Sequence, residues 1–148
     1  MSELEEQLKS LLDREAIRDL PLRYCDCVWR DDLAGIVNLF SPDGTFTVVN
    51  AKGEKKVSGH KELHVMYRDA AYIMPRPYIH NHVVELTEEG RARGRCYLDL
   101  RSAREKMGWH GAGFYEDDYV KSNGEWKFQS RRFHALRLEE MPPVLAPS

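Results

Sequence analysis

A strict alternation of side chains between residues 91 and 101 constrains this chain more than any other feature of its sequence. The small or apolar residues of this stretch are Ala92, Gly94, Cys96, Leu98 and Leu100, and the polar or charged ones are Arg91, Arg93, Arg95, Tyr97, Asp99 and Arg101. Successive side chains of a strand point to opposite faces, so this period of two predicts a strand with one dry and one solvated face. A sheet built from such strands needs a cover on its dry face.

The N-terminal half supplies that cover. Between Glu3 and about Arg30, apolar residues recur at steps of three and four, which is the helical period. Pro21 cannot donate to the carbonyl of Ile17, so we expect a kink or a break there. A short second helix follows over 33–40 and ends in the turn residues 41–44. A third helix is predicted after Ser58 or Gly59, and it stops before the prolines at 75 and 77.

The rest of the chain is predicted to form strands. Residues 45–49 and 55–57 suggest a hairpin at a sheet edge, and four further strands are expected over 78–86, 91–101, 110–121 and 125–136. Their short polar connections indicate antiparallel neighbours. Helices first and strands second predict an α+β fold with the helices on one face of the sheet. We expect a single domain over residues 1–148, with a core at about 11–136 and an extended tail at 141–148.

Composition excludes several classes of function. The 22 basic and 24 acidic residues nearly cancel, so we expect neither nucleic acid nor a membrane as a partner. No apolar run is long enough to cross a bilayer and the first residues are acidic, so we expect a cytoplasmic protein. Cys25, Cys27 and Cys96 are an odd number without a C-x-x-C pair, which indicates reduced thiols.

Several short motifs, in this order of elements, carry a family resemblance. They are residues 14–20 (REAIRDL), 39–44 (LFSPDG), the helix start at Gly59 and 124–128 (GEWKF). Together they resemble the SnoaL-like branch of the nuclear transport factor 2-like superfamily, over roughly residues 11–135. The resemblance implies a conical α+β barrel, or cystatin-like roll, whose curved and mostly antiparallel sheet surrounds a pocket.

The resemblance also implies a kind of chemistry. Polyketide cyclases, scytalone dehydratase, ketosteroid isomerase and a dehydrochlorinase share this fold and move protons beside a carbonyl, hydroxyl or chloride, generally without a metal or organic cofactor. Other relatives do no chemistry, including dioxygenase β subunits. We therefore expect no cofactor, and a small hydrophobic, aromatic or cyclic molecule as the ligand.

The dehydratase-like relatives hold a catalytic histidine with an acid from the first helix. By alignment, the acid position falls on Trp29 and the histidine position on Pro77, and neither residue can do that work. Asp26 lies one helical turn before Trp29, and His80 lies three residues after Pro77. A local shift in register would let His80 act as the general base and Asp26 as its orienting carboxylate.

Further candidates complete the predicted site. By the same alignment, Arg131 corresponds to a pocket-lining arginine and Tyr24 to a ligand-facing helix position. With Asn81, both would stabilise developing negative charge. The expected ligand-binding residues are Asn81, Trp29, Phe40, Cys96, Leu98 and His110. The small residues after His110 would let a ligand or a helix approach the backbone, or would let the sheet curve.

The segment His80-Asn81-His82 leaves alternatives open. On a regular strand both histidines share a face and Asn81 points the other way. Either His80 is a base, which requires a bulge after Pro77, or Asn81 points inward and donates to the ligand. In the third alternative, both histidines lie on the outer face, at a dimer contact or in solvent. His60 and His64 stand one helical turn apart, where surface positions are favoured over a metal site.

Two functions follow as hypotheses. The first is a cofactor-independent lyase or isomerase of dehydratase or cyclase type, acting on a cyclic, partly hydrophobic small molecule. The second is a non-catalytic ligand-binding or assembly domain, in which the charged outer face of the sheet forms a homodimer or a higher homo-oligomer. Cross-strand pairs between residues 115–119 and Arg131 or Arg132 are expected, with Arg131 turned inward.

Overall fold

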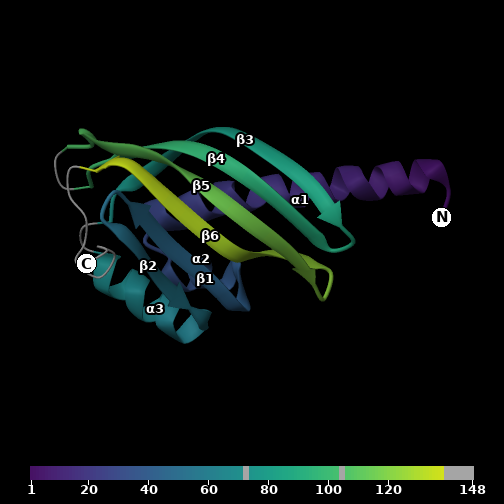
Figure 1. The fold of residues 1–148 in the computed structure, drawn as a ribbon, viewed down its shortest axis with the longest axis horizontal. Coiled ribbons are helices and arrows are strands. Elements are labelled where there is room, and N and C mark those ends of the chain that lie inside the picture. The colour runs from purple at the N-terminus through teal and green to yellow at the C-terminus, as the bar shows by residue number, and fades with distance from the viewer. Residues whose placement is uncertain (72–73, 104–105, 139–148) are drawn as a thin grey trace.

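The computed structural model describes residues 1–71, 74–103 and 106–138 (Figure 1). Its elements are α1 (Glu3–Trp29), α2 (Leu33–Asn38), β1 (Phe40–Asn50), β2 (Gly53–Ser58), α3 (Gly59–Ala70), β3 (Arg76–Glu88), β4 (Arg91–Arg101), β5 (Trp109–Ser122) and β6 (Glu125–Leu138). The strands of these residues form one six-stranded sheet in the order β2-β1-β6-β5-β4-β3. The fold is α+β, as predicted, and the sheet is open rather than a closed barrel. The predicted tail at 141–148 lies outside the described residues.

Helix α1 runs unbroken through Pro21, so the predicted break is wrong. Pro21 is buried together with Ile17, Leu20 and Tyr24, and this packing offsets the loss of one backbone hydrogen bond. At its start, the Glu5 backbone N–H donates to the Ser2 hydroxyl over 3.1 Å. Among the described residues, no helix is both long and apolar enough to cross a bilayer.

The first turns of α1 carry exposed leucines. Figure 1 shows this part of the helix projecting beyond the strands. Leu4, Leu8 and Leu11 are all more than half exposed. At about 100° per residue, these leucines lie on the side of α1 roughly opposite Ile17 and Tyr24, which face the sheet. Helix α1 therefore has one apolar side near its N-terminus and another near its C-terminus. Only the C-terminal one, with Ile17 and Tyr24, packs on the core.

The sheet is mostly antiparallel, with β1 and β6 as its parallel pair. The predicted edge hairpin is confirmed as β1 and β2. The expected turn at 41–44 lies instead within β1, where the pairing with β6 shifts between Phe40 and Thr45. Ser41 is buried there and its hydroxyl donates to the Phe128 carbonyl over 3.3 Å. Turn-type residues thus form a bulged strand start.

The core lies between the inner face of the sheet and the covering helices α1 and α3 (Figure 1). The alternation in β4 is confirmed, because its small and apolar set is turned inward and Cys96 is 0% exposed. At Gly113 of β5, a Cβ atom would lie 2.3 Å from the His134 carbonyl oxygen. The small residue is needed there because the neighbouring strand β6 approaches closely. Cys25, Cys27 and Cys96 are buried free thiols.

Candidate functional site

An apolar pocket of about 60 Å³ lies where α1 and α3 meet the inner face of the sheet. Its walls are Tyr24, Val28, Phe46, Tyr67, Met74, Pro75, Pro77, Leu100, Tyr115 and Phe133. Helix α1 supplies Tyr24 and α3 supplies Tyr67, each from the apolar stripe that its helical period directs to the core. The polar groups among these walls are tyrosine hydroxyls. The pocket is therefore lined by apolar side chains, with tyrosine hydroxyls as its hydrogen-bonding groups.

The tyrosines form a compact cluster. The Tyr24 and Tyr67 hydroxyl oxygens are 2.7 Å apart and share a hydrogen bond. Tyr115 packs edge-on against Tyr24, with ring centroids 5.9 Å apart. Burial raises the pKa of Tyr24 to about 12 and raises the pKa values of Tyr67 and Tyr115 well above their ordinary value. The hydroxyls therefore stay protonated near pH 7 and can serve as donors.

Arg131 lies behind this cluster, paired with Asp117 of the adjacent strand. Register places the two residues opposite each other on β6 and β5, and both side chains are 0% exposed. Arg131 Nε donates to Asp117 Oδ1 over 3.0 Å, and Nη2 donates to Oδ2 over 3.4 Å. The guanidinium carbon lies 3.5 Å from the centroid of the Tyr115 ring and 4.3 Å from that of Tyr24. Arg131 is turned inward and lies directly behind two walls of the pocket.

A chain of hydrogen bonds continues from this ion pair. The Tyr119 hydroxyl donates to Asp117 Oδ2 over 3.0 Å, and His82 Nε2 lies 3.0 Å from the same hydroxyl oxygen. Since the Tyr119 proton goes to Asp117, His82 is the donor to Tyr119. Burial raises the pKa of Asp117, while the Arg131 charge and the Tyr119 hydroxyl oppose that rise. The interior thus holds a four-residue polar chain from His82 to Arg131.

A β-bulge explains why His82 points inward. The pairing of β3 with β4 shifts between Ile79 and His82, so His80 and Asn81 on β3 oppose the single residue Tyr97 on β4. The extra residue reverses the parity of the strand. His80 then lies on the outer face and His82 on the inner face, although a regular strand would put both on one side. The hypothesis that His80 is the general base required a bulge after Pro77. The bulge is present, but it turns His82 toward the interior instead of His80.

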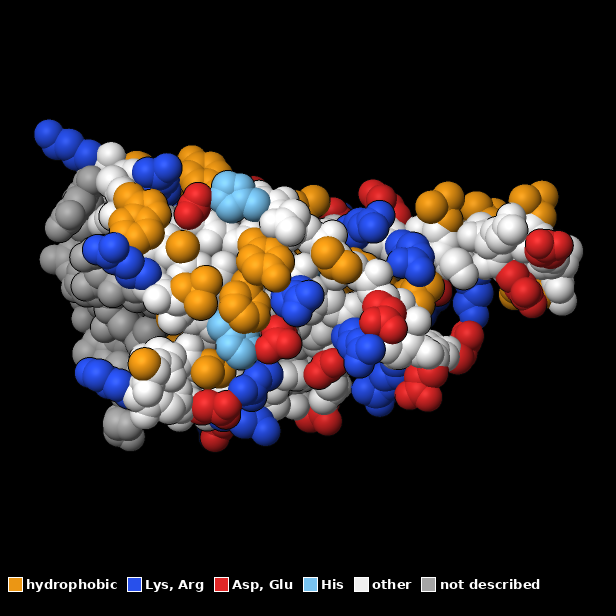
Figure 2. Space-filling view, turned by 45° about the horizontal axis from the view of Figure 1, so that its top comes forward, with side chains coloured by type: hydrophobic (Ala, Val, Ile, Leu, Met, Phe, Trp, Pro, Cys, Tyr) orange, Lys and Arg blue, Asp and Glu red, His pale blue; other side chains and the backbone are white. Residues whose placement is uncertain are grey.

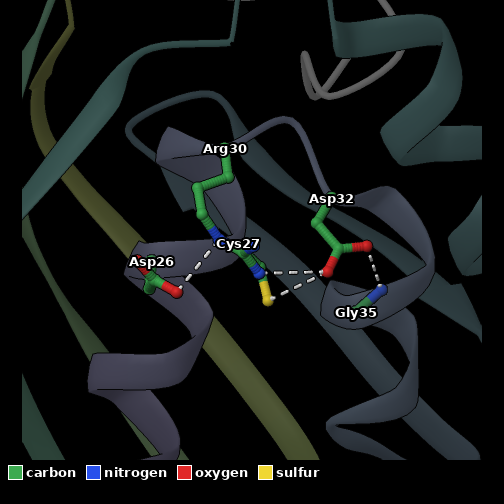
Figure 3. Close-up of polar contacts among 5 residues, drawn as sticks. All are labelled: Asp26, Cys27, Arg30, Asp32 and Gly35. Atoms are coloured by element: carbon green, nitrogen blue, oxygen red, sulfur yellow. Dashed lines mark hydrogen bonds and ion pairs between the residues drawn. The ribbon is translucent and has the colours of Figure 1, made fainter.

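His80 and Asp26 do not meet, which corrects the predicted base and its orienting acid. His80 Nε2 lies 2.8 Å from Asp99 on the outer face. Figure 3 shows Asp26 on the surface of α1, where its carboxylate accepts from Arg30 Nε over 3.1 Å. In the same view, Asp32 accepts from the Gly35 backbone N–H over 2.9 Å and caps α2. Asp26 therefore belongs to the α1–α2 corner, outside the pocket.

Trp29 and Pro77, to which the sequence alignment assigns the family's acid and histidine, are in contact. The Trp29 indole N–H donates to the Pro77 carbonyl over 2.8 Å. Trp29 is 36% exposed and packs edge-on against Tyr78, so it lies at the surface rather than in the predicted lining. Asn81 is exposed within the bulge, which excludes the inward alternative. Neither Trp29 nor Pro77 has a titratable side chain, so this contact cannot supply an acid and base pair.

The remaining predicted ligand-binding residues are buried, but outside the pocket walls. Phe40, Cys96, Leu98 and His110 are each no more than 5% exposed. Phe40 packs on Tyr24 and Phe128, so its ring fills the core. Within the described residues, no three His, Cys, Asp or Glu side chains converge on a metal position. His60 instead lies 2.8 Å from the Phe40 carbonyl oxygen.

Although the cross-strand pair expected between residues 115–119 and Arg131 is confirmed by Asp117, sequence reasoning assigned no role at the site to five residues: His82, Tyr67, Tyr115, Asp117 and Tyr119. The last three stand at alternate positions of β5, so one strand face carries two phenols and a carboxylate. This alternate spacing, together with the inward direction expected for Arg131, could have identified these three residues from the sequence. The signal for His82 was absent, because a bulge cannot be placed from local alternation.

His82 gives the fold a pH dependence. Burial, with Arg131 and Arg18 nearby, lowers the pKa of His82 from 6.5 to about 4. Between these two pH values His82 is protonated in the unfolded chain but neutral in the folded chain. The free energy of unfolding therefore falls as the pH drops from about 6.5 towards 4. We expect a loss of about 1–2 kcal/mol after allowance for the exposed part of the ring.

Urea titrations of the wild type and of His82→Gln at pH 7 and pH 4.5 test this expectation. The variant should lose about 1–2 kcal/mol less than the wild type between the two pH values. Equal losses in both proteins would show that His82 does not titrate between these limits.

Comparisons with known proteins agree with the fold. Residues 9–132 match the SnoaL-like domain family. A protein of unknown function from Mycobacterium tuberculosis is 25% identical and covers 96% of this chain and 80% of its own, with a TM-score of 0.76. A nuclear transport factor 2-like protein with a cystatin-like fold from Novosphingobium aromaticivorans is 20% identical over 98% of this chain and 96% of its own, with a TM-score of 0.78.

Two further neighbours have the same fold at lower sequence identity. A candidate scytalone dehydratase from Novosphingobium aromaticivorans is 18% identical over 86% of this chain and 87% of its own, with a TM-score of 0.73. ActVI-ORFA from Streptomyces coelicolor is 15% identical over 83% of this chain and 97% of its own, with a TM-score of 0.70. At this identity they show the fold alone. The family match, which spans most of the chain, shows that this protein belongs to the SnoaL-like domain family.

Proposed function

We propose that this domain binds a small, flat and largely apolar cyclic molecule, whose oxygen accepts a hydrogen bond from the tyrosine cluster. The supporting observation is the hydroxyl pair of Tyr24 and Tyr67 at the wall of an otherwise apolar pocket. Tyr24 hydrogen-bonds with Tyr67 and with Tyr115. The three hydroxyls carry three protons for these two hydrogen bonds, so one proton remains to donate. A ligand oxygen would satisfy it.

The charge behind the cluster supports the same proposal. Arg131 lies against the Tyr24 and Tyr115 rings, and its positive charge lowers their pKa values against the larger effect of burial. Each phenol is therefore more acidic, and a stronger hydrogen-bond donor, than the same buried phenol would be without Arg131. The ligand oxygen is therefore expected to be electron-rich, as in a ketone, a phenol or an enol.

The size of the pocket limits the ligand. A volume of about 60 Å³ is well below the range of ordinary ligand pockets, which begins at about 300 Å³. A six-membered ring fits if a wall side chain turns aside. Met74 lines the pocket and has an unbranched, flexible side chain suited to that movement. We therefore propose a ligand of one or two rings.

The proposal is tested by measuring the binding of phenol and of toluene with ligand-observed NMR. The two rings have nearly the same shape, and one hydrogen bond of about 0.5–1.5 kcal/mol should make phenol bind up to about tenfold tighter. We expect Tyr67→Phe to abolish that preference. Tyr78→Phe, on the outer surface, is the matched control and should retain it. The absence of binding by either ring would refute the proposal.

A lyase or isomerase activity is the second candidate. Its supporting observation is that phenols backed by a guanidinium would stabilise negative charge on a substrate oxygen. The name of the scytalone dehydratase neighbour is in keeping with such chemistry. However, the described pocket walls carry no carboxylate or imidazole to act as a base. His82 is bonded to Tyr119 and lies outside those walls.

Exchange of the α-hydrogens of cyclohexanone in D₂O separates the two candidates. Under the binding proposal, the protein leaves the exchange rate close to that of buffer. Exchange at least tenfold faster than in buffer, and lost in Tyr67→Phe, would establish proton transfer in this pocket and favour the lyase or isomerase.

A further inference from the structure

The solvent-facing side of helix α1 carries residues at the spacing of a coiled-coil seam. This α1 seam consists of Leu4, Leu8, Leu11, Glu15, Arg18, Leu22 and Trp29. From Leu4 to Leu22 the steps alternate between four and three residues, which is the spacing of the contact positions in a heptad repeat. At about 100° per residue, the whole seam lies within about 80° of the helix surface, on the side away from the core.

The α1 seam is open to solvent over the length of the helix. Leu22, like the leucines of the first turns, is more than half exposed. Glu15 and Arg18, in the middle of the seam, are exposed as well. Figure 2 shows hydrophobic side chains along the end of α1 that projects at the right of the view. A contiguous apolar row of this kind marks an interaction surface.

Two charges at the centre of the seam indicate what covers it. Within the described residues, the side chains of Glu15 and Arg18 have no hydrogen bond or ion pair. Asp19, beside the seam, is by contrast paired with Arg23 of the same helix. The seam therefore has one negative and one positive position, three residues apart, in an otherwise apolar row. A complementary surface must present the opposite charges in the reverse order.

We propose that the α1 seam docks on α1 of a second copy of this chain, with the two helices antiparallel. The two-fold axis crosses the helices near residues 16 and 17. Glu15 then lies opposite Arg18 of the second copy, and Arg18 lies opposite its Glu15. A two-fold interface must be self-complementary, and this register meets that condition. The inference is independent of the ligand proposed for the interior pocket.

The same register also matches the apolar positions of the seam. Leu11 lies opposite Leu22 of the second copy, and Leu4 lies opposite its Trp29. Trp29 is 36% exposed and so is available for this contact. The antiparallel direction brings the positive N-terminal end of each helix dipole to the negative C-terminal end of the other. Charge, shape and dipole therefore favour one arrangement.

Other arrangements of the two helices are less favourable. A parallel pair in register would set Glu15 against Glu15 of the second copy, and like charges face to face oppose association. An antiparallel pair shifted by one heptad would set Glu15 against Leu11 of the second copy. That shift would cover a carboxylate without giving it a partner.

The contact area predicts a weak association. From Leu4 to Trp29 the helix is about 38 Å long, and a helix with its side chains is about 10 Å wide. The seam thus covers roughly 400 Å² per copy before side-chain relief is added, about half of the 800 Å² of a standard interface. We expect a Kd on the order of 0.1 mM or somewhat below.

Disulfide trapping of the full chain tests this register. In the double variant L11C/L22C, the two cysteines of one helix are about 16 Å apart along its axis, which is too far for a bond within the chain. Under mild oxidation we expect a covalent dimer, seen by electrophoresis in denaturant without reductant. Mass spectrometry should show residue 11 of one copy linked to residue 22 of the other.

The single variants are the matched controls for trapping. Leu11→Cys alone and Leu22→Cys alone should link at least tenfold more slowly, since each cysteine lies about 16 Å from its own counterpart. The wild type should stay unlinked, because its three cysteines are buried. Circular dichroism checks that each variant is folded.

Charge variants in the L11C/L22C background test the centre of the seam. Glu15→Arg and Arg18→Glu should each slow trapping at least fivefold. The swapped pair E15R/R18E should return to within about threefold of the L11C/L22C rate, since opposite charges again face each other. Lys61→Glu, at an exposed position on α3, is the matched control and should leave the rate unchanged.

Three results would overturn the inference. One is a folded L11C/L22C protein that links no faster than the single variants, which would leave the seam to a different protein or to a lipid surface. A second is rapid linking of Leu11→Cys alone, which would indicate a parallel pair. The third is a trapping rate that Glu15→Arg and Arg18→Glu leave unchanged.

Discussion

Replacing Asp117 by Leu is expected to lower the free energy of unfolding by about 3–5 kcal/mol, because it leaves the buried Arg131 guanidinium without a counter-charge. Arg131 Nη1 already has no hydrogen-bond partner among the described residues, so no nearby group can replace the carboxylate. Arg131→Met should lower the free energy of unfolding by a similar amount, because it leaves the buried Asp117 carboxylate without a counter-charge. Urea unfolding measured by circular dichroism provides both values.

The double variant separates the free-energy cost of burying the two charges from the free energy gained by their pairing. In D117L/R131M both charges are gone and apolar side chains fill the space, so we expect a loss well below the sum of the single losses. Glu88→Leu, at an exposed position on β3, is the matched control and should change stability by no more than about 0.5 kcal/mol. Additive losses in the double variant would mean that Asp117 and Arg131 are not coupled.

Gly113→Ala is expected to destabilise the fold by about 3 kcal/mol. The added Cβ would lie 2.3 Å from the His134 carbonyl oxygen and 2.8 Å from a Phe133 ring atom. The oxygen belongs to the backbone of β6, so relief requires the two strands to move apart. Thermal and urea unfolding measure the loss.

The neighbouring residue provides the comparison for Gly113. Ala112→Ser adds one atom on the opposite, half-exposed side of the same strand and should cost no more than about 0.5 kcal/mol. Equal stability of Gly113→Ala and the wild type would mean that the close approach of β5 and β6 is relieved without cost. The curvature of the sheet would then not depend on this glycine.

The buried ion pair bears on function as well as on stability. Arg131 is packed between aromatic rings and bonded to Asp117, so it acts on the pocket through Tyr24 and Tyr115. A guanidinium held in this way supplies a fixed positive charge without needing to reorganise. The site is therefore suited to hold an electron-rich oxygen. It lacks, in its described walls, the base that proton abstraction from carbon requires.

Much of the architecture follows from the sequence because periodicity is a local property. The alternation in β4 fixed which of its side chains face the core, and the spacing in α3 fixed Leu63, Met66 and Tyr67 as its buried stripe. The inward direction of Arg131 was also predicted. Pro21 was misjudged because tertiary packing compensates for a hydrogen bond that the isolated helix would lose.

The sequence by itself determined the fold class, the elements and the family, since each depends on patterns within a few turns or one strand. Only the tertiary structure decided which polar groups meet. The bulge between Ile79 and His82 adds one residue to β3, which reverses the side on which the residues from His82 to Leu86 lie. Strand pairing brought Asp117 to Arg131, and helix packing brought Tyr67 to Tyr24. The pairing of Asp117 with Arg131 was among the cross-strand pairs expected from the sequence, whereas Tyr67 and Tyr24 lie far apart in the chain, so no local pattern records their contact.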